Sequence, residues 1–409
     1  MNAPLPKLAA QAADGADGGR PLVVHVVHSL SMGGLETLLV DCINRMPAER
    51  YRHAVVCLTG YSDFADNITR PDVTLHALGK PPGLGLGTHL TFWRLMRRLR
   101  PTVLHTYNLS ALEYAFTAAC AGVPVRIHAE HGRDASDPHG LNAKHNLLRR
   151  LLVPFVDRYI PVSEDLDRWL DQVVRIPRAS TLFIKNGVDT DKFAPRAFPA
   201  GAAPGGSPWH ADDFVIGTVA RVQDVKNHRA LVEAFAAVRA RRPDLAPRLK
   251  LSIVGDGPLL PAVRAQVAAL GLEDAVWLPG ARGDVKDLLH TFSLFALPSL
   301  AEGTPVSLLE AMACGLPVVA ANGGGVAELV DEDTGLLAEP DSVDSLAGAI
   351  DAIFERDLAR MGMAARRKAV ERYDWNEILP QVLGRYDGLL GRHARTPREP
   401  ERICVTDSN

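Results

Sequence analysis

The sequence lacks long apolar runs, a strong charge of either sign and closely spaced cysteines. No segment approaches the roughly 18 apolar residues that span a bilayer, so we expect any membrane contact to be peripheral. The formal net charge of −3 gives no general case for binding nucleic acid. The five cysteines include no C-x-x-C pair. This cysteine pattern argues against a disulfide frame or a zinc site. It fits a protein in the reducing cytoplasm, either free or at the inner face of the cytoplasmic membrane.

The composition is that of a folded protein with more than one core. Hydrophobic residues make up 47% of the 409 and charged residues 23%, which is typical of globular rather than disordered chains. A chain of this length favours two domains with a cleft between them. Residues 1–20 hold no apolar stretch long enough for a signal peptide and are rich in Ala, Gly and Asp, so we expect a disordered leader there. The polar residues 393–409 predict a disordered tail.

Short apolar runs alternate with longer amphipathic segments from residue 21 onward. This pattern predicts the α/β class, with parallel strands covered by helices on both faces. It stops over 194–207, where Pro and Gly are frequent, and then restarts. We therefore expect two doubly wound domains, 21–194 and 213–372, a linker over 195–212 and a closing helix over 373–392. The expected strands are 22–28, 53–58, 73–77, 102–107, 125–129, 158–162 and 181–184, then 214–220, 249–255, 275–278, 293–297, 317–320 and 335–338.

One segment of the second half has the features of a phosphate site. After the strand expected over 293–297, Thr304 is a natural N-cap, Pro305 suits the first helical position, and Gly315 suits a left-handed C-cap. The start of such a helix presents free N–H groups and a positive dipole end, and Gly303 lets the backbone approach a ligand closely. This favours a phosphorylated ligand.

Two glutamates and two cations accompany this segment. Glu302 lies in the loop and Glu310 nearly two turns inside the helix, so they can meet different parts of one extended ligand. Arg221 and Lys226 follow the first strand of the second half, where two cations can neutralise a diphosphate. The alternative is that Glu302 caps the helix while Glu310, Arg221 and Lys226 are solvated surface residues.

The nine residues from Glu302 to Glu310 resemble the E-x7-E signature of the GT-B retaining glycosyltransferases of family four, the glycosyl transferases of group 1. The resemblance spans roughly residues 21–390 and implies two Rossmann-like domains facing a cleft. Within the family, residues 130–191 are similar to exopolysaccharide sugar transferases linked to the PEP-CTERM/exosortase system. The supporting motifs, in order, are SMGGLE at 31–36, EHGRD at 130–134, VS at 162–163, NGVD at 186–189, Arg221 with Lys226, and VGDGP at 254–258.

The resemblance implies a nucleotide-diphosphate sugar as donor, bound by the C-terminal domain. Arg221 and Lys226 would bind its diphosphate, Glu310 its ribose hydroxyls, and Glu302 the hydroxyls of the transferred sugar. The family's usual mechanism, a front-face substitution with the leaving phosphate as base, would retain the anomeric configuration.

The remaining site residues also come from the resemblance. The backbone of Gly303 and Thr304 would complete the phosphate site. Gly33 and Gly34 resemble the glycine loop that approaches donor phosphate and acceptor, although a Gly-Gly pair before a helix is otherwise a tight turn. His131 would stand beside the transferring sugar, although a lone His at a strand end is more often structural.

We expect no cofactor and no required metal. The one nearby D-x-D candidate, Asp189 to Asp191, lies at the interdomain junction rather than at a strand end beside the diphosphate. The implied acceptor is a glycan or lipid-linked saccharide of bacterial exopolysaccharide or cell-envelope synthesis, docked on the N-terminal domain.

Two basic amphipathic segments leave a membrane contact open. Residues 92–100 and 144–152 mix apolar and basic side chains, which suits an anionic lipid surface. The alternative is that their apolar residues pack on the sheet while arginines face water. Two other functions also remain open: a nucleotide-sugar 2-epimerase of the same architecture, and a non-catalytic nucleotide-sugar-binding subunit.

Overall fold

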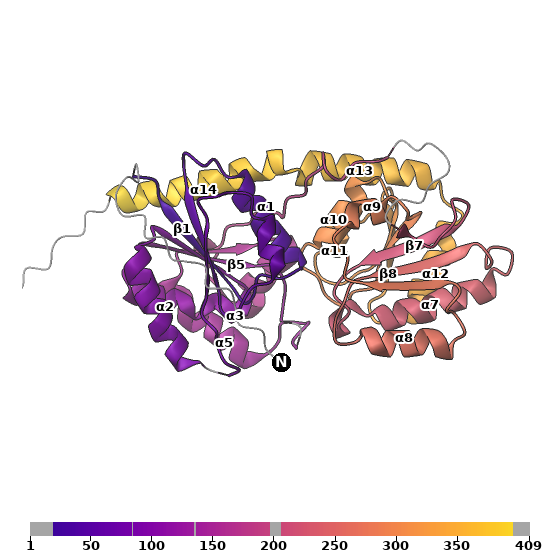
Figure 1. Ribbon diagram of the computed structural model, residues 1–409, viewed down its shortest axis with the longest axis horizontal. Coiled ribbons are helices and arrows are strands. Elements are labelled where there is room, and N and C mark those ends of the chain that lie inside the picture. The colour runs from indigo at the N-terminus through magenta and orange to yellow at the C-terminus, as the bar shows by residue number, and fades with distance from the viewer. Residues whose placement is uncertain (1–18, 84, 135, 197–205, 396–409) are drawn as a thin grey trace, which may run out of the picture.

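A computed structural model describes residues 19–395 except 84, 135 and 197–205. Residues 396–409 of the expected tail, nearly all of the expected leader and half of the expected linker therefore lie outside the described residues, whereas residues 393–395 are helical rather than part of a disordered tail. Figure 1 shows two α/β halves side by side, each built around one sheet.

The first sheet has six parallel strands in the order β3-β2-β1-β4-β5-β6. The strand expected over 181–184 is wrong. The N–H groups of Leu182 and Ile184 donate to the β6 carbonyls of Tyr159 and Pro161, but only one bridge, between Tyr159 and Thr181, forms there. The strands are β1 (Leu22–Val27), β2 (Arg52–Cys57), β3 (Thr74–Ala77), β4 (Val103–Tyr107), β5 (Val125–Glu130) and β6 (Arg158–Pro161).

The second sheet repeats this topology in the order β12-β11-β10-β7-β8-β9, again with parallel neighbours. The predicted α/β class with doubly wound sheets is confirmed. The strands are β7 (Phe214–Val219), β8 (Leu249–Val254), β9 (Val276–Gly280), β10 (Leu294–Leu297), β11 (Val318–Ala321) and β12 (Gly335–Ala338).

Helices cover both faces of each sheet, so central strands such as β1, β4 and β10 are fully buried rather than alternating in exposure. In the first half they are α1 (Gly34–Arg45), α2 (Leu86–Leu99), α3 (Asn108–Leu112), α4 (Tyr114–Cys120), α5 (Ala143–Leu152) and α6 (Glu164–Trp169). In the second half they are α7 (His228–Arg241), α8 (Leu260–Ala269), α9 (Val285–Leu289), α10 (Val306–Ala313), α11 (Val326–Leu329), α12 (Val343–Ile353) and α13 (Leu358–Tyr373).

A last helix, α14 (Trp375–Arg395), returns from the second half and lies over the first (Figure 1). Its Trp375, Ile378 and Tyr386 are buried in the core cluster that includes β1 and α1. The Tyr386 hydroxyl bonds to His105 Nδ1 at 2.6 Å, and Asp387 accepts from the Tyr51 hydroxyl. The chain therefore ends on a helix that packs one face into the core of the first half.

Strand order reverses beside β1 in the first sheet and beside β7 in the second. In open parallel sheets, such reversal points open a crevice at the carboxyl ends of the strands. The segments singled out from the sequence follow β1, β5, β7 and β10, at or beside these points.

Candidate active site

The carboxyl ends of the two sheets meet each other directly. A side-chain carbon built on Gly33, after β1, would lie 3.8 Å from the Arg221 guanidinium, after β7. One built on Gly34 would lie 3.5 Å from Val306 at the start of α10. The structure therefore brings the predicted glycine loop, Arg221 and the predicted phosphate helix together.

Gly303 lies against the backbone of the first half. A methyl group there would stand 2.3 Å from the carbonyl oxygen of His131, closer than any real contact. Because two backbones meet at this point, only glycine fits without moving one of them. His131 and the loop of Glu302 are consequently held side by side across the domain interface.

The start of α10 differs by one residue from the expectation. The N-cap is Pro305, with extended backbone, and Val306 is the first helical residue. Thr304 does not cap the helix because its hydroxyl donates to the carbonyl of Val162 at 2.7 Å. Asn186 in turn donates to the carbonyl of Thr304 at 2.9 Å. With no side-chain cap, the first-turn N–H groups of α10 are available to a ligand.

Lys226 and Glu302 form an ion pair, with Nζ and Oε1 2.5 Å apart. Their loops are tied together by a hydrogen bond from Leu300 N to the carbonyl of Val225. Lys226 is therefore already positioned at the loop that precedes α10.

Glu310 is buried, so the interpretation of it as a solvated surface residue is wrong. It is the fifth residue of α10, a little over one turn from the helix start rather than nearly two. Burial raises the pKa of Glu310 to about 8. The nearby carboxylate of Asp41 also raises this pKa, whereas the positive charge of Lys192 lowers it. At neutral pH this group is therefore mostly a neutral acid.

His131 follows β5, and its N–H donates to the side chain of Asn108 at 2.8 Å. Its ring Nδ1 is buried and has no partner among the described residues. Burial lowers the pKa of His131 to about 4, although the carboxylate of Glu130 opposes this shift. The imidazole is therefore neutral and free to bond a ligand hydroxyl.

Glu130 anchors the His131 loop through a fully buried ion pair. Arg149 Nε lies 2.6 Å from Glu130 Oε1, and His128 Nε2 lies 3.2 Å from the same oxygen. Burial opposes ionisation, yet Arg149 and His128 together lower the pKa of Glu130 to about 2. The prediction that Arg149 belongs to a basic surface segment is therefore wrong.

The sequence interpretation missed a second set of close approaches. Side-chain carbons built on Gly323, Gly324 and Gly325 would each lie within 2.4 Å of carbonyl oxygens in the Glu302 loop. Three successive glycines after a strand were the available signal. Glu328 was also missed: its carboxylate accepts from the N–H groups of Glu164 and Asp165, at 3.0 and 2.9 Å, and so closes the start of α6 across the interface.

Asp189 is engaged in structural contacts. Its carboxylate pairs with Arg45 and accepts from the N–H groups of Asp191 and Lys192. No group of three metal-type side chains comes together anywhere in the described part of the chain.

Two doubly wound domains whose strand ends face each other are typical of a glycosyltransferase of the GT-B type. The family models agree: "Glycosyltransferase Family 4" matches residues 32–192, and "Glycosyl transferases group 1" matches 213–356. The chain therefore belongs to the group 1, family 4 glycosyltransferases and is an enzyme of the transferase class.

Known proteins are similar over nearly the whole chain. EpsF of Bacillus subtilis (strain 168), which bears a glycosyltransferase name, is 29% identical over 85% of this chain and 89% of its own. The UDP-Gal:alpha-D-GlcNAc-diphosphoundecaprenol alpha-1,3-galactosyltransferase of Escherichia coli is 25% identical over 86% and 93%. Among solved structures, HepE of Anabaena in complex with UDP and glucose has a TM-score of 0.75 at 22% identity, covering 90% of this chain and all of that one. This last likeness supports the fold.

Proposed function

We propose that this protein is a retaining transferase. It moves a hexosyl-type sugar from a nucleotide-diphosphate sugar to a glycan or lipid-linked saccharide in bacterial exopolysaccharide or cell-envelope synthesis. The observation that carries the proposal is the meeting of Arg221, the Lys226–Glu302 pair and the uncapped start of α10 at one interface. The narrower resemblance to PEP-CTERM/exosortase-linked transferases stays a prediction.

The chemistry follows from charge. As the bond between sugar and diphosphate breaks, the sugar becomes oxocarbenium-like and the diphosphate gains negative charge. Arg221, Lys226 and the dipole at the start of α10 oppose that negative charge, and they do so in a partly buried site where electrostatic stabilisation is strong. Glu302 and Glu310 bind hydroxyls of the sugar and the ribose.

Retention of configuration fits this division of roles. Glu302 is paired with Lys226, and Glu310 is a mostly neutral acid, so neither is a ready nucleophile for a covalent glycosyl intermediate. In a front-face substitution the leaving phosphate takes the proton of the acceptor hydroxyl. The reaction then needs neither cofactor nor metal, since Arg221, Lys226 and α10 supply the positive charge.

The acceptor is proposed to dock on the first domain. The Escherichia coli relative is named for a diphosphoundecaprenol-linked sugar, which supports a lipid-linked acceptor here. Within the described residues no helix is long and apolar enough to cross a bilayer.

The lower layer of the first domain offers a surface for peripheral membrane contact (Figure 1). On α2, Phe92 and Met96 pack on the sheet, while Leu90 and Trp93 are exposed beside Arg97. On α5, Leu152 is buried and both Leu147 and Leu151 are exposed. The apolar residues thus divide between the core and a basic outer face, which suits an anionic lipid surface.

The test of the function is a transfer assay. The protein is incubated with labelled nucleotide sugars and membrane lipid extract, and the label is followed into lipid, epimer or free sugar. We expect label in lipid or glycan, with the donor's anomeric configuration retained at the new linkage. Epimer formed without acceptor would identify a 2-epimerase, and binding without turnover a non-catalytic subunit.

The membrane contact has its own test. Liposomes of anionic lipid should sediment the protein, and reversing the charges of Arg97 and Arg98 should release it. Arg367 on the far half is exposed and serves as a charge-reversal control. Sedimentation that is insensitive to Arg97 and Arg98 would contradict the membrane proposal.

A further inference from the structure

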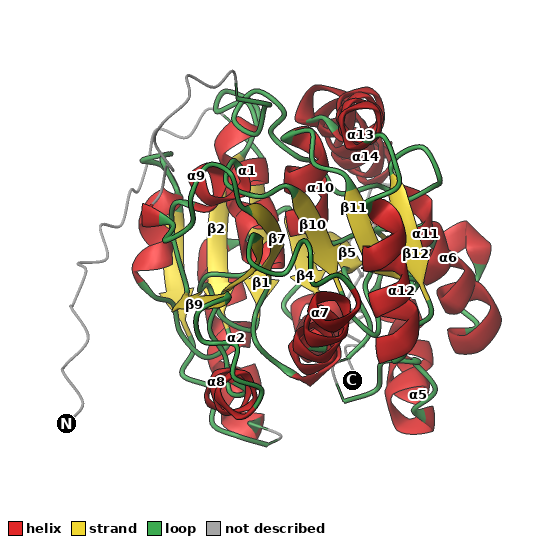
Figure 2. Cartoon of the chain, turned by 90° about the vertical axis from the view of Figure 1, so that its right-hand side faces the viewer, coloured by secondary structure: helices red, strands yellow, loops and turns green. Residues whose placement is uncertain are grey.

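Glu328 lies on α11, and its carboxylate reaches across the domain interface to the start of α6. It accepts hydrogen bonds from the backbone N–H groups of Glu164, at 3.0 Å, and Asp165, at 2.9 Å. These are the first two residues of α6, and Figure 2 shows α6 and α11 on the same side of the molecule. A helix of the first domain is therefore capped by a carboxylate of the second, which the positive dipole end of the helix favours.

Two uncharged contacts surround this cap. The Thr304 hydroxyl donates to the carbonyl of Val162, two residues before α6, at 2.7 Å. A side-chain carbon built on Gly325, just before α11, would lie 2.8 Å from the side chain of Ser163. These contacts fit the two surfaces closely to each other, whereas Glu328 supplies charge-assisted hydrogen bonds, which are the stronger kind.

The segment that carries Glu328 also holds the Glu302 loop. The N–H of Gly325 donates to the carbonyl of Glu302 at 3.0 Å, and the N–H of Glu302 donates to the carbonyl of Gly323 at 3.2 Å. Gly325 stands directly before the first residue of α11 and three residues before Glu328. The Glu302 loop and the Glu328 carboxylate are thus fixed to one short stretch of backbone.

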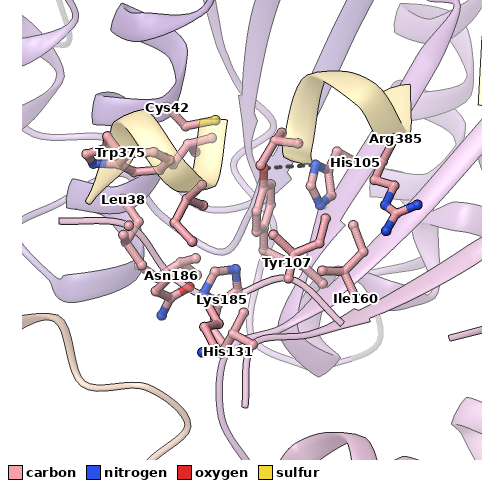
Figure 3. A pocket seen from close by; sticks show the side chains of 18 of the residues that line it. Leu38, Cys42, His105, Tyr107, His131, Ile160, Lys185, Asn186, Trp375 and Arg385 are labelled. Carbon is pink, nitrogen blue, oxygen red and sulfur yellow. Dashed lines mark hydrogen bonds between the residues drawn. The ribbon is translucent and has the colours of Figure 1, made fainter. Parts of the chain in front are cut away.

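On the other side of the interface, α6 holds the loop that follows His131. Asp165 Oδ2 lies 2.7 Å from Arg133 Nη2, and only 13% and 23% of the Arg133 and Asp165 side chains are exposed. The Arg133 guanidinium also lies over the ring of Trp169, the last residue of α6, at 5.6 Å from its centroid. Arg133 is two residues from His131, which lines a pocket of the first domain (Figure 3). The position of α6 therefore sets the position of the His131 loop.

These contacts make a continuous path between the two residues assigned to the transferring sugar. The path runs from Glu302 through Glu328, Asp165 and Arg133 to His131. None of the residues assigned to the nucleotide belongs to it. A break at Glu328 therefore changes how His131 and Glu302 lie relative to each other and leaves the nucleotide contacts in place.

We propose that Glu328 is a positioning residue for the transfer step, because it caps α6 across the domain interface and so holds His131 and Glu302 at their working separation. The proposal rests on the proposed function, in which the transferring sugar lies between these two residues. A sugar held from both sides is oriented for reaction, and a small displacement of one side lowers the rate strongly.

The experiment measures transfer, UDP affinity and thermal unfolding of three variants of the full chain. Glu328→Ala removes both hydrogen bonds and should lower kcat at least about tenfold, with unchanged KM for the donor and unchanged UDP affinity. Glu328→Gln keeps the shape of the side chain and one acceptor oxygen, so its kcat should lie between that of wild type and that of Glu328→Ala. Glu332→Ala removes an exposed carboxylate four residues further on and should leave kcat unchanged.

A cap that merely stabilises α6 gives a different result. It would lower the unfolding temperature and the UDP affinity together with kcat, and that outcome would overturn the proposal, as would an unchanged kcat in Glu328→Ala. Where Glu328→Ala does not fold, Glu328→Gln carries the same test. The route through Arg133 is tested by combining Glu328→Ala with Arg133→Ala. The double variant should lose no more than the larger single loss, and full addition of the two losses would overturn the proposal.

Hydrogen exchange tests the positioning without any transfer reaction. In Glu328→Ala the amides of residues 131–134 should exchange about tenfold faster, together with those of residues 164–165. Faster exchange confined to residues 164–165 would overturn the proposal, because a plain helix cap acts no further. A wild-type protein that transfers no sugar would remove the proposed function alone, since the exchange of residues 131–134 still decides whether Glu328 holds the His131 loop.

Discussion

Binding of a nucleotide should release a proton from Glu310. Burial raises the pKa of this group to about 8, so it is mostly protonated at pH 7. Ribose hydroxyls that donate to a carboxylate favour its charged form and lower its pKa. If the bound carboxyl is fully ionised at pH 7, about 0.9 proton leaves per nucleotide.

The same linkage predicts how affinity depends on pH. Between the bound pKa and about 8, the affinity for UDP should rise by up to about tenfold per pH unit, and then level off. Glu310→Gln keeps the shape of the side chain and removes the titration, so its affinity should lack this rise. Since the phosphate of UDP ionises equally in both experiments, the ratio of the two dissociation constants isolates Glu310.

The assay is calorimetry at pH 7 in several buffers of different ionisation enthalpy. The slope of the observed enthalpy against buffer enthalpy counts the protons released. Equal slopes for wild type and Glu310→Gln would refute the reasoning. Affinity that falls above pH 8 would also refute it, because Glu310 would then donate to the ribose as a neutral acid.

The pH dependence of folding stability, measured without nucleotide, gives an independent test of the raised pKa of Glu310. A carboxyl whose pKa is raised on folding contributes stability that is complete below its unfolded pKa of 4.5 and is lost as pH rises through about 8. The loss is at most on the order of 5 kcal/mol. The unfolding temperature of Glu310→Gln minus that of wild type should therefore be larger at pH 9 than at pH 4.

Further predictions concern the rest of the site. Arg221→Ala should lower the transfer rate at least about 100-fold with unchanged thermal unfolding, because it removes positive charge from the leaving diphosphate; a near-normal rate would exclude that role. Gly303→Ala places a methyl group 2.3 Å from the His131 carbonyl and should cost about 100-fold in transfer by displacing the loop; an unaltered rate would show that the interface yields freely. Tyr386→Phe removes one hydrogen bond to His105 and should cost about 1 kcal/mol in urea unfolding; an unchanged midpoint would contradict it. Chelation should leave transfer intact, whereas loss restored by manganese would sink the metal-free mechanism.

The fold class could be predicted from local features, and local features also indicated where a candidate site lies. Apolar runs of strand length between amphipathic segments indicate parallel sheets, whatever their neighbours are. Residues from Glu302 to Glu310 carry loop, helix start and periodicity in one continuous stretch. The helix limit at Gly315, with a φ of 80°, follows from local backbone preference in the same way.

The contacts that give the site its chemistry join residues distant in sequence. The sequence predicts Thr304 as an N-cap, but its hydroxyl donates a hydrogen bond to the carbonyl of Val162 in the other domain. Arg149 looked like surface charge until Glu130, on β5, was seen to hold it in the core. Local sequence preferences do not predict such hydrogen-bond and ion-pair partners, because the partners depend on which strand ends meet in the folded protein.

Glu310 shows the limit most clearly. Spacing places it on the helix after Glu302, and spacing alone fits either a solvated or a buried carboxylate. Its burial, and with it the pKa of about 8, arises only where α10 packs against α1 of the other domain. The order of residues along the chain therefore supplied the strands, the helix start and the candidate carboxylates. Packing of the two domains decided their solvation, protonation and partners, since desolvation and charge pairing depend on distances in space.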